Sequence, residues 1–458
     1  MAMKKTIILL LALGVGFSAW AQKETPPEGG TPHAFTLPKR STFTLDNGIE
    51  VTMIPYGSIP KATVRIVVKT GSVHEQEDEV WLSDLMASLM AEGNTTAEGV
   101  DMNTHLAKMG GQLSINAGSN TTNLSTTVLA EFADDAVLAL AGVLQNPAFP
   151  EARLEALRND LVRRSSLAKS RPQNLANERF EQLLYPDSPY GRSIPNEDLL
   201  SAYTMEQVKG FYNAQFGAQR TQVYVAGVFD EEAVKEAITN SLSAWKDGPE
   251  VSYPNVEASQ FGSFAIIDRP GAPQSTIVYG LPVVPPSHPD FVGLEVTNAL
   301  LGGSFGSRIT SNIREDKGYT YSPSSYVSTE IGNAYWAEAA DVTTEFTGAS
   351  LEQIDYEIKK LSNEVPTEDE LKGIQTYMAG IYVLQNSTAP GIIGQLVFLD
   401  VHDLPESYLT QRVENIYEIT PEKVSALMKQ YISPDKMTLV IVGDEEVVEK
   451  QVMPYRKE

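Results

Sequence analysis

The sequence contains no cysteine among its 458 residues. Disulfide bonds, thiolate metal sites, a cysteine nucleophile and a lipid anchor on cysteine are therefore excluded. Histidine is scarce as well, with five residues in the whole chain. Because histidine is the commonest protein ligand of metals, this scarcity narrows the places where a metal could bind.

Basic residues are outnumbered, with 35 Lys and Arg against 59 Asp and Glu, which gives a formal net charge of −24. A nucleic-acid partner is excluded on this ground, because phosphates would be repelled at long range. The apolar content of 42% and the charged content of 21% are typical of globular proteins. A chain of this length favours two or more compact units, since domains usually have about 100–200 residues.

Long apolar runs are also missing, and the one at the N-terminus covers only residues 7–17. It follows Lys4 and Lys5 and precedes the small-x-small sequence Ala19-Trp20-Ala21. This order predicts a signal peptide over residues 1–21, since a membrane anchor would need about 20 apolar residues. We therefore expect a periplasmic protein without a membrane anchor, with a flexible lead-in over residues 22–35.

The chain repeats itself. Thr204 precedes an apolar pattern of helical period and then the strand-like residues 223–227. The same order returns 216 residues later, from Thr420 to residues 439–443. Threonine at a helix N-cap, an amphipathic helix and a β-branched strand are predicted in both copies.

The openings of the two copies also correspond, because strands predicted over residues 62–69 and 274–281 each lead into a long helical segment. The sequence therefore predicts domains at residues 36–243 and 262–450, joined by a linker over 244–261 and followed by a tail over 451–458. Strands followed by blocks of helix indicate an α+β fold with two homologous domains. We expect an antiparallel sheet of about six strands, packed with helices, in each.

Several short motifs of the first copy carry a family resemblance. A helix predicted over residues 80–91 is followed by Glu92-Gly93-Asn94-Thr95, and later segments read Leu144-Gln145-Asn146-Pro147 and Ser188-Pro189-Tyr190-Gly191-Arg192. This succession resembles the amino-terminal half of M16 metallopeptidases, the insulinase, pitrilysin and processing-peptidase family. The resemblance extends over nearly the whole chain after residue 35, and it implies the M16/LuxS-like duplicated fold.

In active members of that family a His-x-x-Glu-His helix and a later glutamate bind zinc and activate water. The resemblance places the two histidines at Asp84 and Ser88, the catalytic glutamate at Ala87 and the later ligand at Arg164. All four positions are changed, and Arg164 adds a fixed positive charge that opposes a cation. The resemblance therefore implies a degenerate zinc site and no metal cofactor in this chain.

The five histidines offer no replacement site, because no two of them lie four apart on a predicted helix. They are His33, His74, His105, His288 and His402. His74 precedes three acidic residues, for which a solvated acidic loop is the preferred interpretation over a metal site.

The second copy keeps a signature that the first lacks. The segment around Ile313-Arg314-Glu315-Asp316-Lys317-Gly318-Tyr319-Thr320-Tyr321 is similar to the carboxy-half signature of the family. There an arginine and a tyrosine seven residues apart bind the substrate and the developing oxyanion, and Arg314 and Tyr321 match them. The residues themselves also allow a pair between Arg314 and a nearby carboxylate, with Tyr321 in the core. Arg308 and Tyr319 are the competing candidates for the pair.

The resemblance implies that this chain is not an enzyme by itself. The expected function is that of a non-catalytic subunit in an exported zinc peptidase heterodimer, which closes the peptide chamber and supplies Arg314 and Tyr321 in trans. The expected partner is a homologous chain with an intact zinc motif, and the expected substrates are peptides. The alternative is a purely structural or peptide-binding protein without a role in proteolysis.

The first prediction concerns zinc. The purified chain should hold no stoichiometric zinc, because Asp84, Ala87, Ser88 and Arg164 supply at most one plausible ligand where three are needed. Metal analysis of protein prepared without chelators is the measurement. One tightly bound zinc per chain would contradict the prediction.

Overall fold

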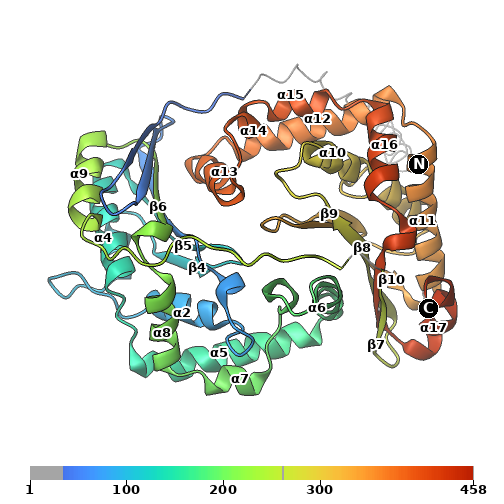
Figure 1. Ribbon diagram of the computed structural model, residues 1–458, viewed down its shortest axis with the longest axis horizontal. Coiled ribbons are helices and arrows are strands. Elements are labelled where there is room, and N and C mark those ends of the chain that lie inside the picture. Colours follow the sequence, from blue (N-terminus) through green and yellow to red (C-terminus); the bar gives the residue numbers. More distant parts are fainter. Residues whose placement is uncertain (1–34, 260–261, 457–458) are drawn as a thin grey trace, which may run out of the picture. The chain divides into compact units, whose positions relative to one another are not determined.

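The structure is a computed structural model that describes residues 35–259 and 262–456. The predicted signal peptide and nearly all of the lead-in lie outside these residues, as does His33. Within the described ranges, no helix is both long and apolar enough to cross a lipid bilayer. The predicted α+β fold is confirmed, with two sheets and helices in both copies (Figure 1).

The first copy, residues 36–243 and here called the first half, contains a six-stranded sheet in the order β1-β2-β6-β3-β5-β4. All pairs are antiparallel except β2 with β6. The strands are β1 (Ser41–Thr44), β2 (Glu50–Pro55), β3 (Lys61–Val68), β4 (Ser114–Ala117), β5 (Thr122–Leu129) and β6 (Thr221–Gly227).

The second copy, residues 262–450 and here called the second half, contains a five-stranded sheet in the order β7-β11-β8-β10-β9. Here too one pair is parallel, β11 with β7. The strands are β7 (Phe264–Asp268), β8 (Gln274–Val283), β9 (Ser324–Val327), β10 (Ala334–Thr343) and β11 (Thr438–Gly443). The expected antiparallel sheets thus each contain one parallel pair, because the last strand of each copy returns beside an early strand, β2 in the first half and β7 in the second.

The helices follow the same plan in both halves. In the first half they are α2 (Leu82–Met90), α3 (Met102–Lys108), α4 (Ala133–Gln145), α5 (Glu151–Ser170), α6 (Pro172–Leu184), α7 (Glu197–Ala202), α8 (Met205–Gln215) and α9 (Glu231–Leu242). In the second half they are α10 (Phe291–Leu301), the π-helical turn η6 (Thr310–Asp316), α11 (Thr347–Asn363), α12 (Glu368–Gln385), α13 (Ala389–His402), α14 (Ser407–Thr410), α15 (Arg412–Tyr417), α16 (Pro421–Tyr431) and α17 (Glu445–Val452).

The predicted threonine caps are confirmed. The Thr204 hydroxyl accepts a hydrogen bond from the backbone of Gln207 at the start of α8, and Thr420 does the same with Lys423 at the start of α16. Each cap satisfies a backbone N–H that the first turn of a helix leaves without a partner. The strands that follow, β6 and β11, are buried along their whole length, as the β-branched pattern predicts.

Each sheet is covered on one face by helices of its own half. The first core contains Val64 and Ile66 of β3 together with Leu85 of α2 and Leu140 of α4. The second core contains Ile277 of β8 together with apolar residues of α10, α11 and α16. Each half therefore has its own hydrophobic core, built from alternate residues of its strands.

The other face of each sheet is covered by a helix from the other half. Helix α6 of the first half packs on β8 and β11 of the second sheet. Its Phe180 ring also meets the ring of Tyr335 on β10, at 5.3 Å between ring centroids. Helix α13 of the second half packs on β3 and β6 of the first sheet, with Ile392 and Ile393 against Val67. Figure 1 shows α6 beside β8 and β10. The halves thus exchange helices, and neither covers both faces of its own sheet.

The second prediction tests this exchange. Phe180→Ala should lower the free energy of unfolding by about 3–5 kcal/mol, because it removes a fully buried ring that anchors α6 on the second sheet. The measurement is urea unfolding followed by tryptophan fluorescence and circular dichroism. Arg179→Ala, at an exposed position of the same helix, is the control and should change stability by less than about 0.5 kcal/mol. Equal effects of the two variants would contradict the assigned packing.

Candidate functional site

Helix α2 carries three of the four degenerate zinc positions, and its start is held in an unusual way. The residue before it, Trp81, has φ 70°, a left-handed conformation that bulky residues rarely adopt. The Trp81 backbone N–H donates to Glu75 at 3.0 Å, and its indole Nε1 donates to the carbonyl of Ser193 at 3.0 Å. These two hydrogen bonds fix the direction in which α2 leaves the preceding loop.

Glu75 is the buried acceptor at the start of α2. Besides the Trp81 N–H, it accepts hydrogen bonds from the backbone N–H of Ser83 at 2.7 Å and from the Ser83 hydroxyl at 2.6 Å. Burial raises the pKa of Glu75 to about 7, and the hydrogen bonds from Ser83 and Trp81 act in the opposite direction. The expectation of a solvated acidic loop is therefore wrong for Glu75, although Glu77 and Asp78 are exposed.

The structure brings two of the degenerate zinc positions into contact. Arg164 of α5 donates to the Asp84 carboxylate of α2 at 3.3 Å, and its guanidinium lies 5.2 Å from the centroid of the Trp81 ring. Burial raises the pKa of Asp84, while the charge of Arg164 lowers it. Ala87 is buried and Ser88 is half-buried on the same helix.

This arrangement does not fit a zinc ion. The one remaining carboxylate, Asp84, is paired with a cation, and Ala87 has no functional group to act on water. Across residues 35–259 and 262–456, no group of three or more acidic or histidine side chains is placed to hold a metal. A metal-dependent step therefore has no support from these four positions.

Three of the four described histidines have structural partners, and His105 is the fourth. His74 accepts from the backbone of Gly71 and contacts the carbonyl of Ser252 at 2.9 Å, and burial lowers its pKa. His288 accepts from the backbone of Asp290 at 3.1 Å. The His402 ring packs on Phe398 at 4.5 Å, and burial lowers its pKa to about 4.

Arg314 and Tyr321 lie together in the second half. The Arg314 guanidinium is 4.9 Å from the centroid of the Tyr321 ring and 4.4 Å from that of Phe305, so that it lies between two aromatic rings. Both rings are exposed, Tyr321 by 79% and Phe305 by 71%. Tyr321 is thus not a core residue, which removes one of the alternatives left open by the sequence.

The side chain of Arg314 is 23% exposed, much less than the two rings beside it. Arg314 Nε forms an ion pair with Glu315 at 3.1 Å, as the other alternative predicted. In the part of the chain that the structure describes, the terminal nitrogens of Arg314 and the hydroxyl of Tyr321 form no hydrogen bond. The rings hold the guanidinium by cation–π contact while its remaining N–H groups can meet a ligand.

The two competing candidates have other partners. Arg308 forms a two-pronged ion pair with Glu370 at 2.7 and 2.8 Å, which fastens the segment before η6 to α12. The Tyr319 ring stacks on Phe346 at 4.6 Å. Both side chains therefore hold the fold of the second half together, and they leave Arg314 and Tyr321 as the pair in contact with each other.

The segment from Gly302 to Gly306 matches the Gly-x-Ser-x-Gly spacing of a serine nucleophile elbow. Such an elbow lies between a strand and a helix, whereas this segment follows helix α10. The hydroxyl of its serine, Ser304, is buried and has no hydrogen-bond partner among the described residues. The match therefore does not define a hydrolase site.

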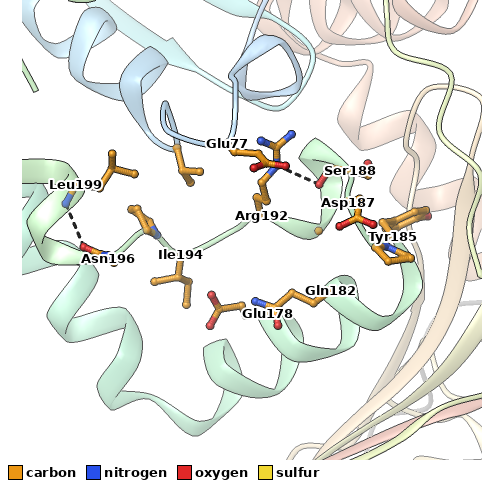
Figure 2. A pocket seen from close by; sticks show the side chains of 14 residues that line it. Glu77, Glu178, Gln182, Tyr185, Asp187, Ser188, Arg192, Ile194, Asn196 and Leu199 are labelled. Atoms are coloured by element: carbon orange, nitrogen blue, oxygen red, sulfur yellow. Dashed lines mark hydrogen bonds between the residues drawn. The ribbon is translucent and has the colours of Figure 1, made fainter.

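Figure 2 shows a cavity of about 520 Å³ near the start of α2. Its charged lining residues are Glu77, Glu178, Asp187 and Arg192, the last of which donates to the carbonyl of Ser188 at 3.3 Å. The side chains of α6 and of the following loop form one wall, and the loop before α2 forms the other. The six candidate residues are not among those that line it, so the cavity is separate from both candidate groups.

Sequence reasoning missed Glu75, Trp81 and Phe305. A glutamate eight residues before Ser83 gives no capping signal, because the known signals span three residues. The exposure of Phe305 also has no signature in a single sequence, since an aromatic residue beside glycines is usually interpreted as a core residue. Each of the three residues is defined by a contact that only the folded chain contains.

Together these features define a class of protein: an α+β chain of two similar halves, in which an ion pair stands at positions that the family resemblance assigns to zinc. Comparison with known families agrees. Residues 53–198 match the family model described as insulinase (peptidase family M16), and residues 202–378 match the model described as peptidase M16 inactive domain. The two matches cover most of the chain, and the chain belongs to the M16 family.

Relatives and solved structures support this assignment. An uncharacterized zinc protease of Rickettsia felis is 23% identical over 352 residues, which cover 75% of this chain and 84% of that protein. A non-peptidase homolog of Helicobacter pylori, YmxG, is 19% identical over 392 residues, which cover 84% of this chain and 90% of that protein. The crystal structure of a peptidase M16 inactive domain from Pseudomonas fluorescens superposes with a TM-score of 0.80 at 22% identity. The superposition covers 88% of this chain and 98% of that chain.

The match to the inactive-domain family model and the similarity to a non-peptidase homolog support a non-catalytic member of the M16 family. The likeness to the Pseudomonas fluorescens structure shows the shared fold. The family resemblance that the sequence motifs carry is thus confirmed.

The third prediction concerns the pH dependence of stability. The pKa of Glu75 is raised on folding. Its contribution to the free energy of unfolding is therefore present in full below about pH 4.5 and is lost as the pH rises through about 7. In Glu75→Gln this loss should be absent, so the stability of the variant relative to wild type should increase between pH 4.5 and 8, by at most about 3 kcal/mol.

Urea unfolding of both proteins across this pH range is the measurement for Glu75. Glu77→Gln, two residues further on and exposed, is the matched control and should follow the wild-type curve. A constant difference between Glu75→Gln and wild type at all pH values would contradict the raised pKa.

Proposed function

We propose that this chain is the non-catalytic subunit of an exported M16 peptidase complex, in which it closes the peptide chamber and supplies Arg314 and Tyr321 to a zinc-bearing partner chain. The observation that carries the proposal is the contrast between the two candidate groups. Asp84 and Arg164, at two of the degenerate zinc positions, form an ion pair, whereas Arg314 and Tyr321 are adjacent and keep donors that have no partner among the described residues.

The chemistry of Arg314 and Tyr321 suits peptide hydrolysis. A guanidinium and a phenol hydroxyl can donate to the carbonyl oxygen of a peptide, and more strongly when that oxygen gains negative charge during attack by water. Phe305 and Tyr321 restrict the guanidinium plane, so that little reorganisation is needed when the peptide binds. The partner would hold the metal, and this chain would orient the peptide and stabilise charge.

Export is supported by the order of charged, apolar and small residues in positions 1–21. An exported chain without a metal site of its own needs a second chain for proteolysis. A homologous M16 chain with an intact His-x-x-Glu-His motif is the partner that supplies the missing residues. Short or unfolded peptides are the substrates that an enclosed chamber admits.

The fourth prediction tests the donor pair. In the complex with the zinc-bearing chain, Arg314→Ala and Tyr321→Phe should each lower the turnover of a fluorogenic peptide by about 10²–10³, because each removes a donor to developing charge. Arg314→Lys should restore only part of the activity, since an ammonium keeps the charge and loses the planar fork.

Melting temperature and complex mass are measured for the same variants and should not change. Arg163→Ala and Tyr356→Phe, at exposed positions elsewhere in the chain, are the matched controls and should keep full turnover. Unchanged turnover per assembled complex in Arg314→Ala would remove the catalytic role. It would favour the alternative of a structural or peptide-binding protein.

A further inference from the structure

The two rings beside the Arg314 guanidinium come from separate segments of the second half. Phe305 lies in the loop between α10 and η6, and Tyr321 lies in the segment that leads from η6 to β9. Each ring is mainly exposed, so its own packing contributes little to its position. The position of each ring therefore depends on what holds its backbone.

Both segments meet at three buried polar residues, Asn298, Ser325 and Glu338, here called the buried cluster. The Ser325 hydroxyl donates to the side-chain oxygen of Asn298 at 2.6 Å, and the indole of Trp336 donates to the same oxygen at 2.8 Å. The backbone N–H of Ser325 donates to the carbonyl of Gly302 at 3.1 Å. The cluster therefore joins the end of α10 to the start of β9.

The cluster lies close along the chain to both rings. Gly302 stands three residues before Phe305, and Ser325 stands four residues after Tyr321. Segments of three or four residues span no more than about 11–14 Å even when fully extended. A displacement at the cluster is therefore passed on to both rings.

Glu338 is the unusual member of the buried cluster. Its side chain is completely buried on β10, and neither of its carboxyl oxygens has a hydrogen-bond partner among the described residues. Burial raises the pKa of Glu338 well above its ordinary range, while the nearby backbone of Ser324 acts in the opposite direction. A buried carboxyl group without a partner is unfavourable, so stability alone would favour an apolar residue at this position.

Gly302 fits against the cluster because it has no side chain. A Cβ atom at this position would lie 2.6 Å from a carboxyl oxygen of Glu338 and 2.5 Å from the hydroxyl oxygen of Ser325, which is closer than such atoms approach in proteins. The φ of Gly302 is −149°, outside the left-handed region, so backbone strain does not require glycine here. The close approach of the cluster requires it.

We propose that Glu338 is a positioning residue: the buried cluster fixes the two segments whose rings hold the Arg314 guanidinium between them. The centroids of the Phe305 and Tyr321 rings lie 4.4 and 4.9 Å from that group. Because a cation–π contact depends on where the rings lie, a shift of either segment displaces the guanidinium. This inference rests on the proposed function, which it deepens by naming what orients the donor pair.

Hydrogen exchange of the full chain alone, measured by mass spectrometry, tests the cluster without a partner. Glu338→Leu removes the carboxyl group and should accelerate exchange about tenfold or more in residues 302–308 and 318–325, because both segments open more often. Glu338→Gln keeps a neutral polar group of similar shape and should exchange as wild type does. Strand β11 and helix α17 are the internal references and should not change.

Gly302→Ala tests the same contact from the other side. Its added methyl group displaces the side chains of Ser325 and Glu338, so it should accelerate exchange in the same two segments. Gly306→Ala is the matched control, because the same methyl group four residues later would meet no atom within 4 Å. It should exchange as wild type does. This pair of variants decides the question if Glu338→Leu does not fold.

Turnover in the complex with the zinc-bearing chain distinguishes positioning from stability. Glu338→Leu and Gly302→Ala should lower kcat for a fluorogenic peptide by about 10–100-fold at an unchanged KM, because displaced donors fail in the transition state. Glu338→Gln should keep the wild-type kcat. Ile432→Ala, in the same core but outside both segments, is the control for stability: it should lower the melting temperature and leave kcat unchanged.

Three results would overturn the inference. The first is unchanged exchange in both Glu338→Leu and Gly302→Ala. The second is equal acceleration over the whole second half, which would make Glu338 an ordinary core residue. The third is faster exchange in the two segments with unchanged kcat, in a complex where Arg314→Ala does lower turnover.

The two proposals fail separately. If Arg314→Ala leaves turnover unchanged while exchange rises only in the two segments, the donor role is removed and the buried cluster still holds the segments. If Arg314→Ala lowers turnover while Gly302→Ala changes neither exchange nor kcat, the donor role is supported and the positioning role of the cluster is removed.

Discussion

The structure depends on one constraint: each half leaves one face of its sheet uncovered by its own helices. Helix α6 covers the second sheet and α13 covers the first, and both contacts are built from fully buried apolar side chains such as Phe180 and Ile392. An uncovered sheet face would expose these apolar residues to water, at a cost proportional to their area. The two halves are therefore joined through their cores.

Duplication allowed the two halves to diverge within the same framework. Helices α5 and α12 keep equivalent hydrogen bonds: Arg158 of α5 donates to the carbonyl of Tyr203, and Gln375 of α12 donates to that of Ile419. The exposed faces of these two helices differ in chemistry. In the first half, the face near α2 carries the ion pair of Arg164 with Asp84, and in the second half it carries apolar residues. The interior contacts hold the fold, so the exposed positions were free to change without loss of stability.

The ion pair at the degenerate zinc positions has a physical logic. The Asp84 carboxylate is half-buried, and such a group without a cation nearby is unfavourable. Arg164 supplies a permanent positive charge at that place, and Trp81 supports its guanidinium. The two side chains that oppose metal binding at this place thus pair with each other.

The sequence by itself determined the features that depend on local patterns: the repeat, the threonine caps at Thr204 and Thr420 and the α+β class. The loss of the four zinc positions stays a prediction from the family resemblance. The tertiary structure alone decided which distant residues meet. The contact of Arg164 with Asp84, the exchange of α6 and α13 and the burial of Glu75 join segments with no sequence signal between them. Periodicity reports which side of an element is apolar, whereas only packing decides which surface that side contacts.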